Sequence, residues 1–187
     1  MARANMRDLS FATFNLLNLQ VPGGLTYSNS PPIEDTPEGR DEYERKIGWT
    51  AAQLVLLDAE VIGFQELWSA SALEDAFRAA SLLDQYDLIA RDAPGIGRPQ
   101  VALAVRKDRN GNSQIAPGAG WIPDFPADFT FDKLRETDGA EEEITVTIDH
   151  FSRPILHAVI QSEGTRPKPP GVSVYVCHLK SKGPARL

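Results

Sequence analysis

Four polar residues stand at the ends of apolar segments, where the strands of a sheet would present their side chains together. Asn15, Glu66 and His178 each follow a strand-like apolar run, and Arg153 precedes another. These residues supply an amide, a carboxylate, an imidazole and a guanidinium. Such groups hold a hard divalent cation through oxygen ligands and contact phosphate through charge-assisted hydrogen bonds. The residue types therefore predict a metal-assisted site for a phosphate ester.

Each of these residues also has a purely structural interpretation. Asn15 is a residue type that commonly ends a strand in a turn, and Glu66 fits the solvated end of a strand. His178 fits a half-buried histidine bonded to a backbone carbonyl, and Arg153, before Pro154, fits an edge strand. Taken singly the residues leave both interpretations open, and their order along the chain favours a site.

The elements that must position these residues alternate between strand and helix at first and are mostly strands later. Short apolar runs predict strands, and apolar residues at three- and four-residue steps predict helices. This order predicts an α/β sandwich with a mixed sheet inside and helices outside. In chain order we expect a strand at 9–15 buried on both faces, a loop at 20–39, a helix at 40–58, a strand at 59–67, a helix at 69–86 with Ser69 as N-cap, strands at 86–91 and 101–108, a hairpin turn at Asn110-Gly111, an irregular acidic stretch at 123–143, and strands at 144–148, 153–161 and 172–179.

Composition narrows the class of protein further. The 187 residues, 42% hydrophobic and 24% charged, are ordinary for one soluble globular domain or part of a larger one. A net charge of −7 argues against a mainly electrostatic nucleic-acid binder, although a divalent cation can supply local positive charge. The single Cys177 excludes an intramolecular disulfide. No run reaches the ~20 apolar residues of a membrane span. No signal peptide is evident, so an exported protein would have lost its signal before residue 1.

Five segments resemble, in order, the motifs of the endonuclease/exonuclease/phosphatase superfamily, which has the DNase-I-like fold. They are "TFNLLNL", "AAQLVLLDAEVIGFQEL", "VALAVRKD", "FSRPILHAVI" and "VYVCHLKSKG". The similarity runs from about Leu9 to Gly183 and is greatest to a bacterial branch whose histidine precedes a Leu-Lys-Ser-Lys run. The resemblance implies that the chain forms part of a four-layer αββα sandwich.

The resemblance also implies roles for individual residues. Glu66 matches the glutamate that coordinates Mg²⁺, or Mn²⁺ in its place, and Asn15 matches the asparagine that helps to hold metal and phosphate. His178 matches a histidine near the scissile phosphate, which acts as a general acid or a phosphate ligand. The remaining matches are cations: Arg153 resembles a phosphate-contacting arginine, and Lys180 and Lys182 are either phosphate-proximal or solvated surface lysines.

The sequence departs from the family pattern after its last strand. No Asp-x-Asn motif and no Asp-His pair follow the matched histidine, and neither His150, which we expect in a loop, nor His157, which we expect in a strand, replaces them. Residues 1–187 are therefore expected to form a single domain that is the N-terminal portion of such an enzyme. Groups that act as a unit are strongly non-additive, so this portion alone is expected to turn over little substrate. Its uncovered apolar sheet face predicts self-association or a need for the missing C-terminal half.

Several functions stay open at this point. A metal-dependent nuclease acting on phosphodiesters, with DNA as a candidate substrate, is favoured because "FSRPILHAVI" followed by the histidine strand resembles nucleases. A phosphatase or a sphingomyelinase of the same superfamily is the alternative enzyme. A non-catalytic binding module would explain the absent motifs but not the presence of Asn15, Glu66 and His178. An unrelated α/β protein is the third possibility, and the cellular location is undetermined.

Overall fold

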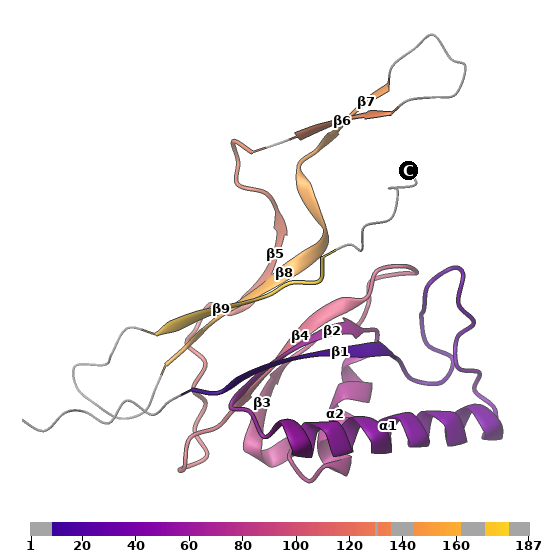
Figure 1. Cartoon of the computed structure of the whole chain (residues 1–187), viewed down its shortest axis with the longest axis vertical. Helices are drawn as coiled ribbons and strands as arrows, with labels where there is room; N and C mark the ends of the chain where they lie inside the picture. The colour runs from indigo at the N-terminus through magenta and orange to yellow at the C-terminus, as the bar shows by residue number, and fades with distance from the viewer. Residues whose placement is uncertain (1–8, 130, 136–143, 162–170, 180–187) are drawn as a thin grey trace, which may run out of the picture.

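The part of the chain that the structure describes folds into two main sheets, two α-helices and a separate two-stranded ribbon (Figure 1). The computed structural model describes residues 9–129, 131–135, 144–161 and 171–179. In chain order the elements are β1 (Phe11–Leu19), α1 (Pro37–Leu57), β2 (Val61–Leu67), α2 (Ala70–Ala79), the 3₁₀ turn η1 (Leu83–Gln85), β3 (Tyr86–Ile89), β4 (Gln100–Arg106), β5 (Gly120–Asp124), β6 (Phe131–Arg135), β7 (Ile144–Ile148), β8 (His150–Ile160) and β9 (Val172–Val176).

The first sheet is mixed, as the order of elements predicts. Its strand order is β1-β2-β4-β3, with β1 parallel to β2 and the other pairs antiparallel. Helices α1 and α2 lie on one face of this sheet, and the antiparallel sheet β5-β8-β9 lies on the other (Figure 1). The β6–β7 ribbon extends away from this body.

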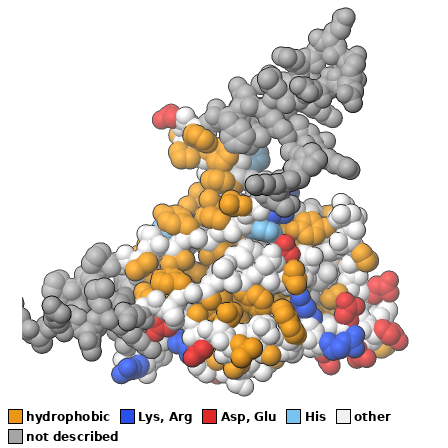
Figure 2. Space-filling view, viewed as in Figure 1, with side chains coloured by type: hydrophobic (Ala, Val, Ile, Leu, Met, Phe, Trp, Pro, Cys, Tyr) orange, Lys and Arg blue, Asp and Glu red, His pale blue; other side chains and the backbone are white. Residues whose placement is uncertain are grey.

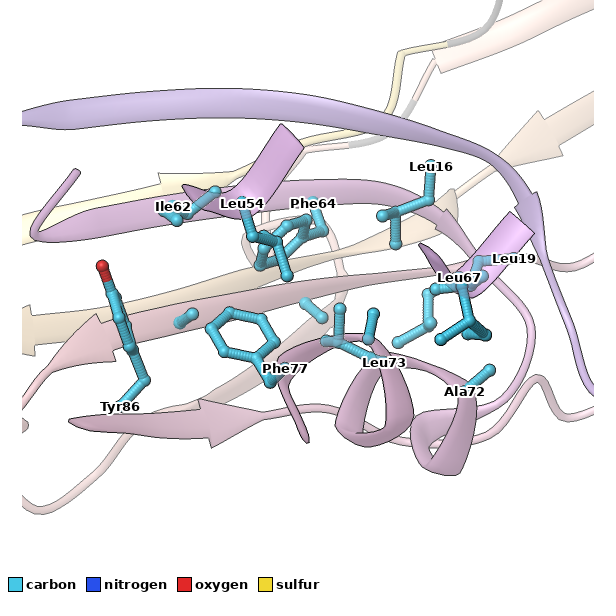
Figure 3. Close-up of a cluster of buried hydrophobic side chains, with 14 of the residues drawn as sticks. Leu16, Leu19, Leu54, Ile62, Phe64, Leu67, Ala72, Leu73, Phe77 and Tyr86 are labelled. Carbon is cyan, nitrogen blue, oxygen red and sulfur yellow. The ribbon is translucent and has the colours of Figure 1, made fainter. Parts of the chain in front are cut away.

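The main hydrophobic core lies between the first sheet and the two helices (Figure 3). Phe77 of α2 is fully buried, and its ring meets the rings of Phe64 and Tyr86 edge-on at 6.1 and 5.3 Å between centroids. Aromatic pairs in this geometry add about 0.5–1.5 kcal/mol beyond the area they bury. These contacts fix α2 against β2 and therefore fix the end of β2 where Glu66 lies.

A second core joins the two sheets. Inward-facing side chains of β2 and β4 meet inward-facing side chains of β8 and β9; they are Val61, Val101, Leu103 and Val105 on one side and Leu156, Ala158, Ile160 and Val176 on the other. At Gly63 a Cβ atom would lie 3.2 Å from Val176, so the absent side chain permits the close approach of β9. The described residues thus form three layers, helices and two sheets. A fourth, helical layer does not occur among them, so the predicted four-layer sandwich stays a prediction.

Both helices differ in length from the sequence-based expectation. Helix α1 begins at Pro37 rather than at residue 40, because Thr36 caps it by accepting a hydrogen bond from the Gly39 backbone N–H at 3.2 Å. Helix α2 ends at Ala79 rather than at residue 86, since Ser81 takes a left-handed φ of 57°. Ser69 occupies the N-cap position as predicted, but Asp92 Oδ1 accepts the hydrogen bond from Ala70 N–H in its place.

The strands also correct several predictions. Strand β1 continues to Leu19 and is not buried on both faces, because it is an edge strand with Phe11 53% exposed. Strand β6 lies inside the stretch at 123–143 that was predicted to be irregular, and β5 starts before that stretch and ends at its beginning; His150 begins β8 instead of lying in a loop. The turn at Asn110-Gly111 forms, but the chain after it bridges to β8 through Ile115 instead of pairing back on β4. A hairpin signal specifies the turn and not the strand that follows.

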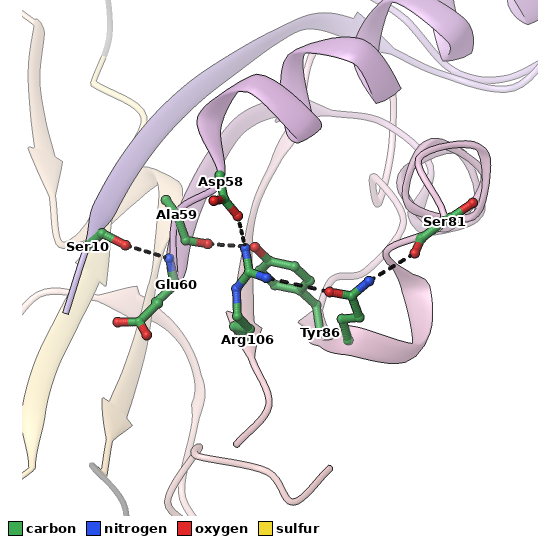
Figure 4. A network of polar contacts seen from close by, with 8 residues as sticks. Ser10, Asp58, Ala59, Glu60, Ser81, Tyr86 and Arg106 are labelled. Atoms are coloured by element: carbon green, nitrogen blue, oxygen red, sulfur yellow. Dashed lines mark hydrogen bonds and ion pairs between the residues drawn. The ribbon is translucent and has the colours of Figure 1, made fainter. Parts of the chain in front are cut away.

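A polar network closes the end of the first sheet opposite to Glu66 (Figure 4). The Tyr86 hydroxyl donates to the Ala59 carbonyl at 2.7 Å, and Glu60 N–H donates to Ser10 Oγ at 2.9 Å. The Arg106 guanidinium lies over the Tyr86 ring and pairs with Asp58. These contacts hold the beginning of β2 to β1, β3 and β4. Among the described helices, none has both the length and the apolarity to cross a membrane.

Strand β1 lies at one edge of the first sheet and β9 at one edge of the second, so within the described residues each of them pairs on one side only. A groove of about 350 Å³ lies between them, and the exposed side chains of Phe11 and Tyr175 lie along it. Unpaired edges with apolar side chains promote association, so self-association stays a prediction for this chain.

Candidate functional site

The ends of β1 and β2 are irregular where Asn15 and Glu66 lie. Between the register pairs Asn15–Gln65 and Leu19–Leu67, β1 advances four residues while β2 advances two. The two extra residues on β1 are accommodated by left-handed backbone, with φ of 48° at Leu17 and 62° at Asn18. A bulge of this kind re-aims side chains that would otherwise alternate across the sheet.

Glu66 occupies a second bulge, on the other side of β2. Between the register pairs Phe64–Ala102 and Leu67–Gln100, β2 advances three residues while β4 advances two. Glu66 itself has a φ of 62°, a left-handed conformation that costs a residue with a side chain about 1–2 kcal/mol. Strain of this kind persists where the surrounding structure imposes it, and it concentrates at functional sites.

Arg153 lies in a third irregularity, in the second sheet. Between the register pairs Ile122–Ile155 and Asp124–His150, β8 advances five residues while β5 advances two. Pro154 belongs to this unpaired stretch, and it has no N–H to give to a ladder. The bulge frees the Arg153 side chain from the alternation of β8, and its Nη2 donates to the Tyr27 hydroxyl at 3.3 Å.

His178 connects the two sheets at this end of the sandwich. It lies two residues after the end of β9, and its Nε2 is 3.5 Å from Glu66 Oε1. The two side chains are only 12% and 18% exposed. On the face shown in Figure 2, a histidine, an acidic and a basic side chain lie beside one another where the sheets meet, with hydrophobic side chains around them.

The surroundings of His178 favour its neutral form. Burial lowers the pKa of its imidazole below the usual range, the Arg153 guanidinium lowers it further, and the Glu66 carboxylate opposes both. Within the described residues the Nδ1 atom of His178 is buried without a hydrogen-bond partner. A neutral imidazole whose Nε2 carries the proton can donate to Glu66 and leave Nδ1 as an acceptor.

Of the residues singled out from the sequence, Glu66, His178 and Arg153 come together. Asn15 lies at the same end of the first sheet, where its Oδ1 accepts a hydrogen bond from Leu17 N–H at 2.9 Å. This local turn is the structural role that the sequence left open for Asn15, and it still leaves the amide oxygen a second lone pair. Lys180 and Lys182 lie outside the described residues.

Sequence reasoning missed two residues of this region, Tyr27 and Lys46. Tyr27 belongs to the loop predicted at 20–39, and no local pattern marks it as different from its neighbours. Lys46 donates from Nζ to the Leu17 carbonyl at 3.3 Å; burial lowers the pKa of its amine, and the Glu66 carboxylate opposes that shift. A lysine on a charged helix is ordinarily a solvated residue, so only the packing of α1 on β1 distinguishes it.

The donor set at this end of the sandwich fits a hard divalent cation with few protein ligands. Among the described residues no three His, Cys, Asp or Glu side chains cluster closely enough to enclose a metal ion. Mg²⁺ retains several waters and needs only one or two carboxylates. The Glu66 carboxylate, with the Asn15 amide oxygen on the neighbouring strand, is consistent with that requirement. A structural zinc site would need four tetrahedral nitrogen or sulfur ligands, which this set does not offer.

Comparisons with protein-family models, with curated proteins and with solved structures found no match to this chain. The resemblance to the endonuclease/exonuclease/phosphatase superfamily therefore stays a prediction. The residues and their geometry carry the functional proposal that follows.

Proposed function

We propose that this chain is a metal-dependent phosphoesterase that hydrolyses phosphodiester bonds, most consistently as a nuclease. The observation that carries the proposal is the convergence of Glu66, His178 and Arg153 from three strands of two sheets. Each strand departs from regular pairing near its residue or ends there. A carboxylate can hold a divalent cation, and that cation, a guanidinium and a hydrogen-bonding imidazole would together stabilise the negative charge that develops on a phosphate.

The chemistry assigns a separate task to each side chain. Glu66, with Asn15 on the neighbouring strand, would hold Mg²⁺ or Mn²⁺, which when bound acts as a Lewis acid on a phosphate oxygen. Arg153 would donate charge-assisted hydrogen bonds to the same phosphate. The lowered pKa of His178 keeps its imidazole neutral near pH 7 in the free site. His178 therefore serves better as a hydrogen-bond donor to phosphate than as the acid that protonates the leaving oxygen.

Metal binding is the direct test of this assignment. Binding of Mn²⁺ to the purified chain is measured by the loss of its free-ion electron paramagnetic resonance signal, with Mg²⁺ as competitor. Glu66→Gln removes the charge and keeps the shape, and we expect it to weaken binding at least tenfold. Glu74→Gln is the matched control, because Glu74 is exposed on α2 away from the site. Equal affinities for the wild type and Glu66→Gln would contradict the proposal.

Cleavage assays identify the substrate class. Supercoiled plasmid DNA, bis-p-nitrophenyl phosphate, p-nitrophenyl phosphate and sphingomyelin are incubated with the wild type and Glu66→Gln, with and without Mn²⁺. We expect slow, metal-dependent cleavage of the diesters that Glu66→Gln abolishes. Cleavage confined to the monoester would favour a phosphatase, and cleavage confined to sphingomyelin would favour a sphingomyelinase. Metal binding with no cleavage of any substrate would favour a binding module.

A further inference from the structure

The loop between β1 and α1 is held in place by hydrogen bonds, and one of its residues contacts the site. The Gly23 N–H donates to the Ile33 carbonyl at 2.7 Å, which closes the loop on itself. Thr26 is buried, and its carbonyl accepts from Gly97 N–H, so the loop is also held to the segment before β4. The residue after Thr26 is therefore placed by contacts on both sides of it.

That residue, Tyr27, packs its ring against a buried tryptophan. The Tyr27 and Trp68 rings meet edge-on with centroids 5.1 Å apart, and Trp68 is only 2% exposed. Trp68 is itself fixed, because its Nε1–H donates to Asn18 Oδ1 at 3.0 Å and its backbone N–H donates to the Leu19 carbonyl at 2.8 Å. The irregular end of β1 thus positions Trp68, which in turn positions Tyr27.

The Tyr27 hydroxyl reaches across to the second sheet. Its oxygen accepts the hydrogen bond from Arg153 Nη2, and the two residues are 126 positions apart in sequence. Burial raises the pKa of the Tyr27 phenol, the charge of Arg153 lowers it and the charge of Glu66 raises it, so both charged groups lie close enough to Tyr27 to interact with it electrostatically. A guanidinium has five N–H donors in a planar fork. The hydrogen bond from Nη2 to Tyr27 fixes the orientation of the guanidinium plane, so the remaining N–H groups of Arg153 point in defined directions.

We infer that Tyr27 is a positioning residue for Arg153, holding the guanidinium beside His178 and Glu66 so that its remaining N–H groups bind the phosphate of the substrate. This inference rests on the proposed function, because it supplies the phosphate-binding side of the same site. It assigns the loop at 20–36 a part in substrate binding. The long, flexible arginine side chain would otherwise lose rotamer freedom on binding, which weakens affinity.

The test measures inorganic phosphate binding by calorimetry, in the presence of Mg²⁺. Tyr27→Phe removes the hydroxyl and keeps the ring on Trp68, and we expect its Kd for phosphate to rise about tenfold, the size of one hydrogen bond to a charged group. Tyr43→Phe is the matched control, since the Tyr43 hydroxyl bonds Asp75 on the helical layer; its Kd should equal that of the wild type. The ¹⁵N resonance of the Arg153 side chain should shift in Tyr27→Phe and not in Tyr43→Phe.

A double-mutant cycle with Arg153→Ala separates positioning from a general structural effect. If Tyr27 acts through Arg153, Tyr27→Phe adds no further loss of phosphate affinity in the Arg153→Ala background. If the wild type and Tyr27→Phe bind phosphate with equal affinity, the role of Tyr27 is overturned and the proposed function still stands. An equal loss in both backgrounds would also overturn it. A wild type that binds no phosphate would overturn both.

Discussion

The left-handed backbone at Glu66 predicts an inversion of the usual preference between alanine and glycine. Both Glu66→Ala and Glu66→Gly remove the carboxylate and its contact with His178, so they differ only in whether a Cβ must be held at a φ of 62°. A residue with a Cβ costs about 1–2 kcal/mol in this region. The glycine variant in turn loses about 0.4–1 kcal/mol of stability relative to the alanine variant, because glycine gives the unfolded chain more conformational entropy to lose on folding.

The net expectation is that Glu66→Gly is more stable than Glu66→Ala by about 0.5–1 kcal/mol. In a chain of this length that difference raises the Tm by roughly 1–4 °C. The assay is urea and thermal unfolding followed by tryptophan fluorescence and circular dichroism. The same pair of substitutions at Glu74, exposed within α2, should give the opposite order by about 1 kcal/mol, because glycine is unfavourable inside a helix.

One outcome of comparing the stabilities of Glu66→Ala and Glu66→Gly would contradict this prediction. If Glu66→Ala is as stable as Glu66→Gly or more stable, the backbone there is not strained and the bulge does not impose it. The site would then lose its structural argument for a functional carboxylate. An inverted order at Glu66 together with the normal order at Glu74 would show that strain is stored at the end of β2.

Two further predictions concern the core and the pH dependence of stability. Phe77→Ala should lower the free energy of unfolding by about 3–5 kcal/mol, because a fully buried ring is replaced by a cavity; chemical denaturation measures this, and a loss under about 1 kcal/mol would contradict the packing described. The folded-state pKa of His178 is lowered, so the folded chain binds fewer protons than the unfolded chain below about pH 6.5. Stability should therefore fall as the pH drops from about 6.5 through that lowered pKa, and more steeply in the wild type than in His178→Gln. Parallel pH profiles of the two proteins would refute this.

Local sequence signals predicted the elements well where one pattern dominated. The run around Phe64 is apolar and short, and it forms β2; the steps through Ile47 and Leu54 form the buried face of α1. The boundaries were wrong where a single residue decides them, as with the cap at Thr36 and the left-handed turn at Ser81. Strand β5 was missed because its short, mostly exposed run pairs with a distant strand, and such pairing leaves no local periodicity.

The residue types and their order along the chain alone determined which groups are available, namely an amide, a carboxylate, an imidazole and a guanidinium at the ends of apolar segments. Only the tertiary structure decided which of them meet. The approach of His178 to Glu66 depends on the second sheet packing on the first, and the contact of Arg153 with Tyr27 depends on a bulge in β8. Sequence periodicity indicates which face of a helix or strand is buried, because the side chains on one face recur every 3.6 residues in a helix and every 2 residues in a strand. Contacts between distant elements depend on register and on its irregularities, which arise only when the strands pair.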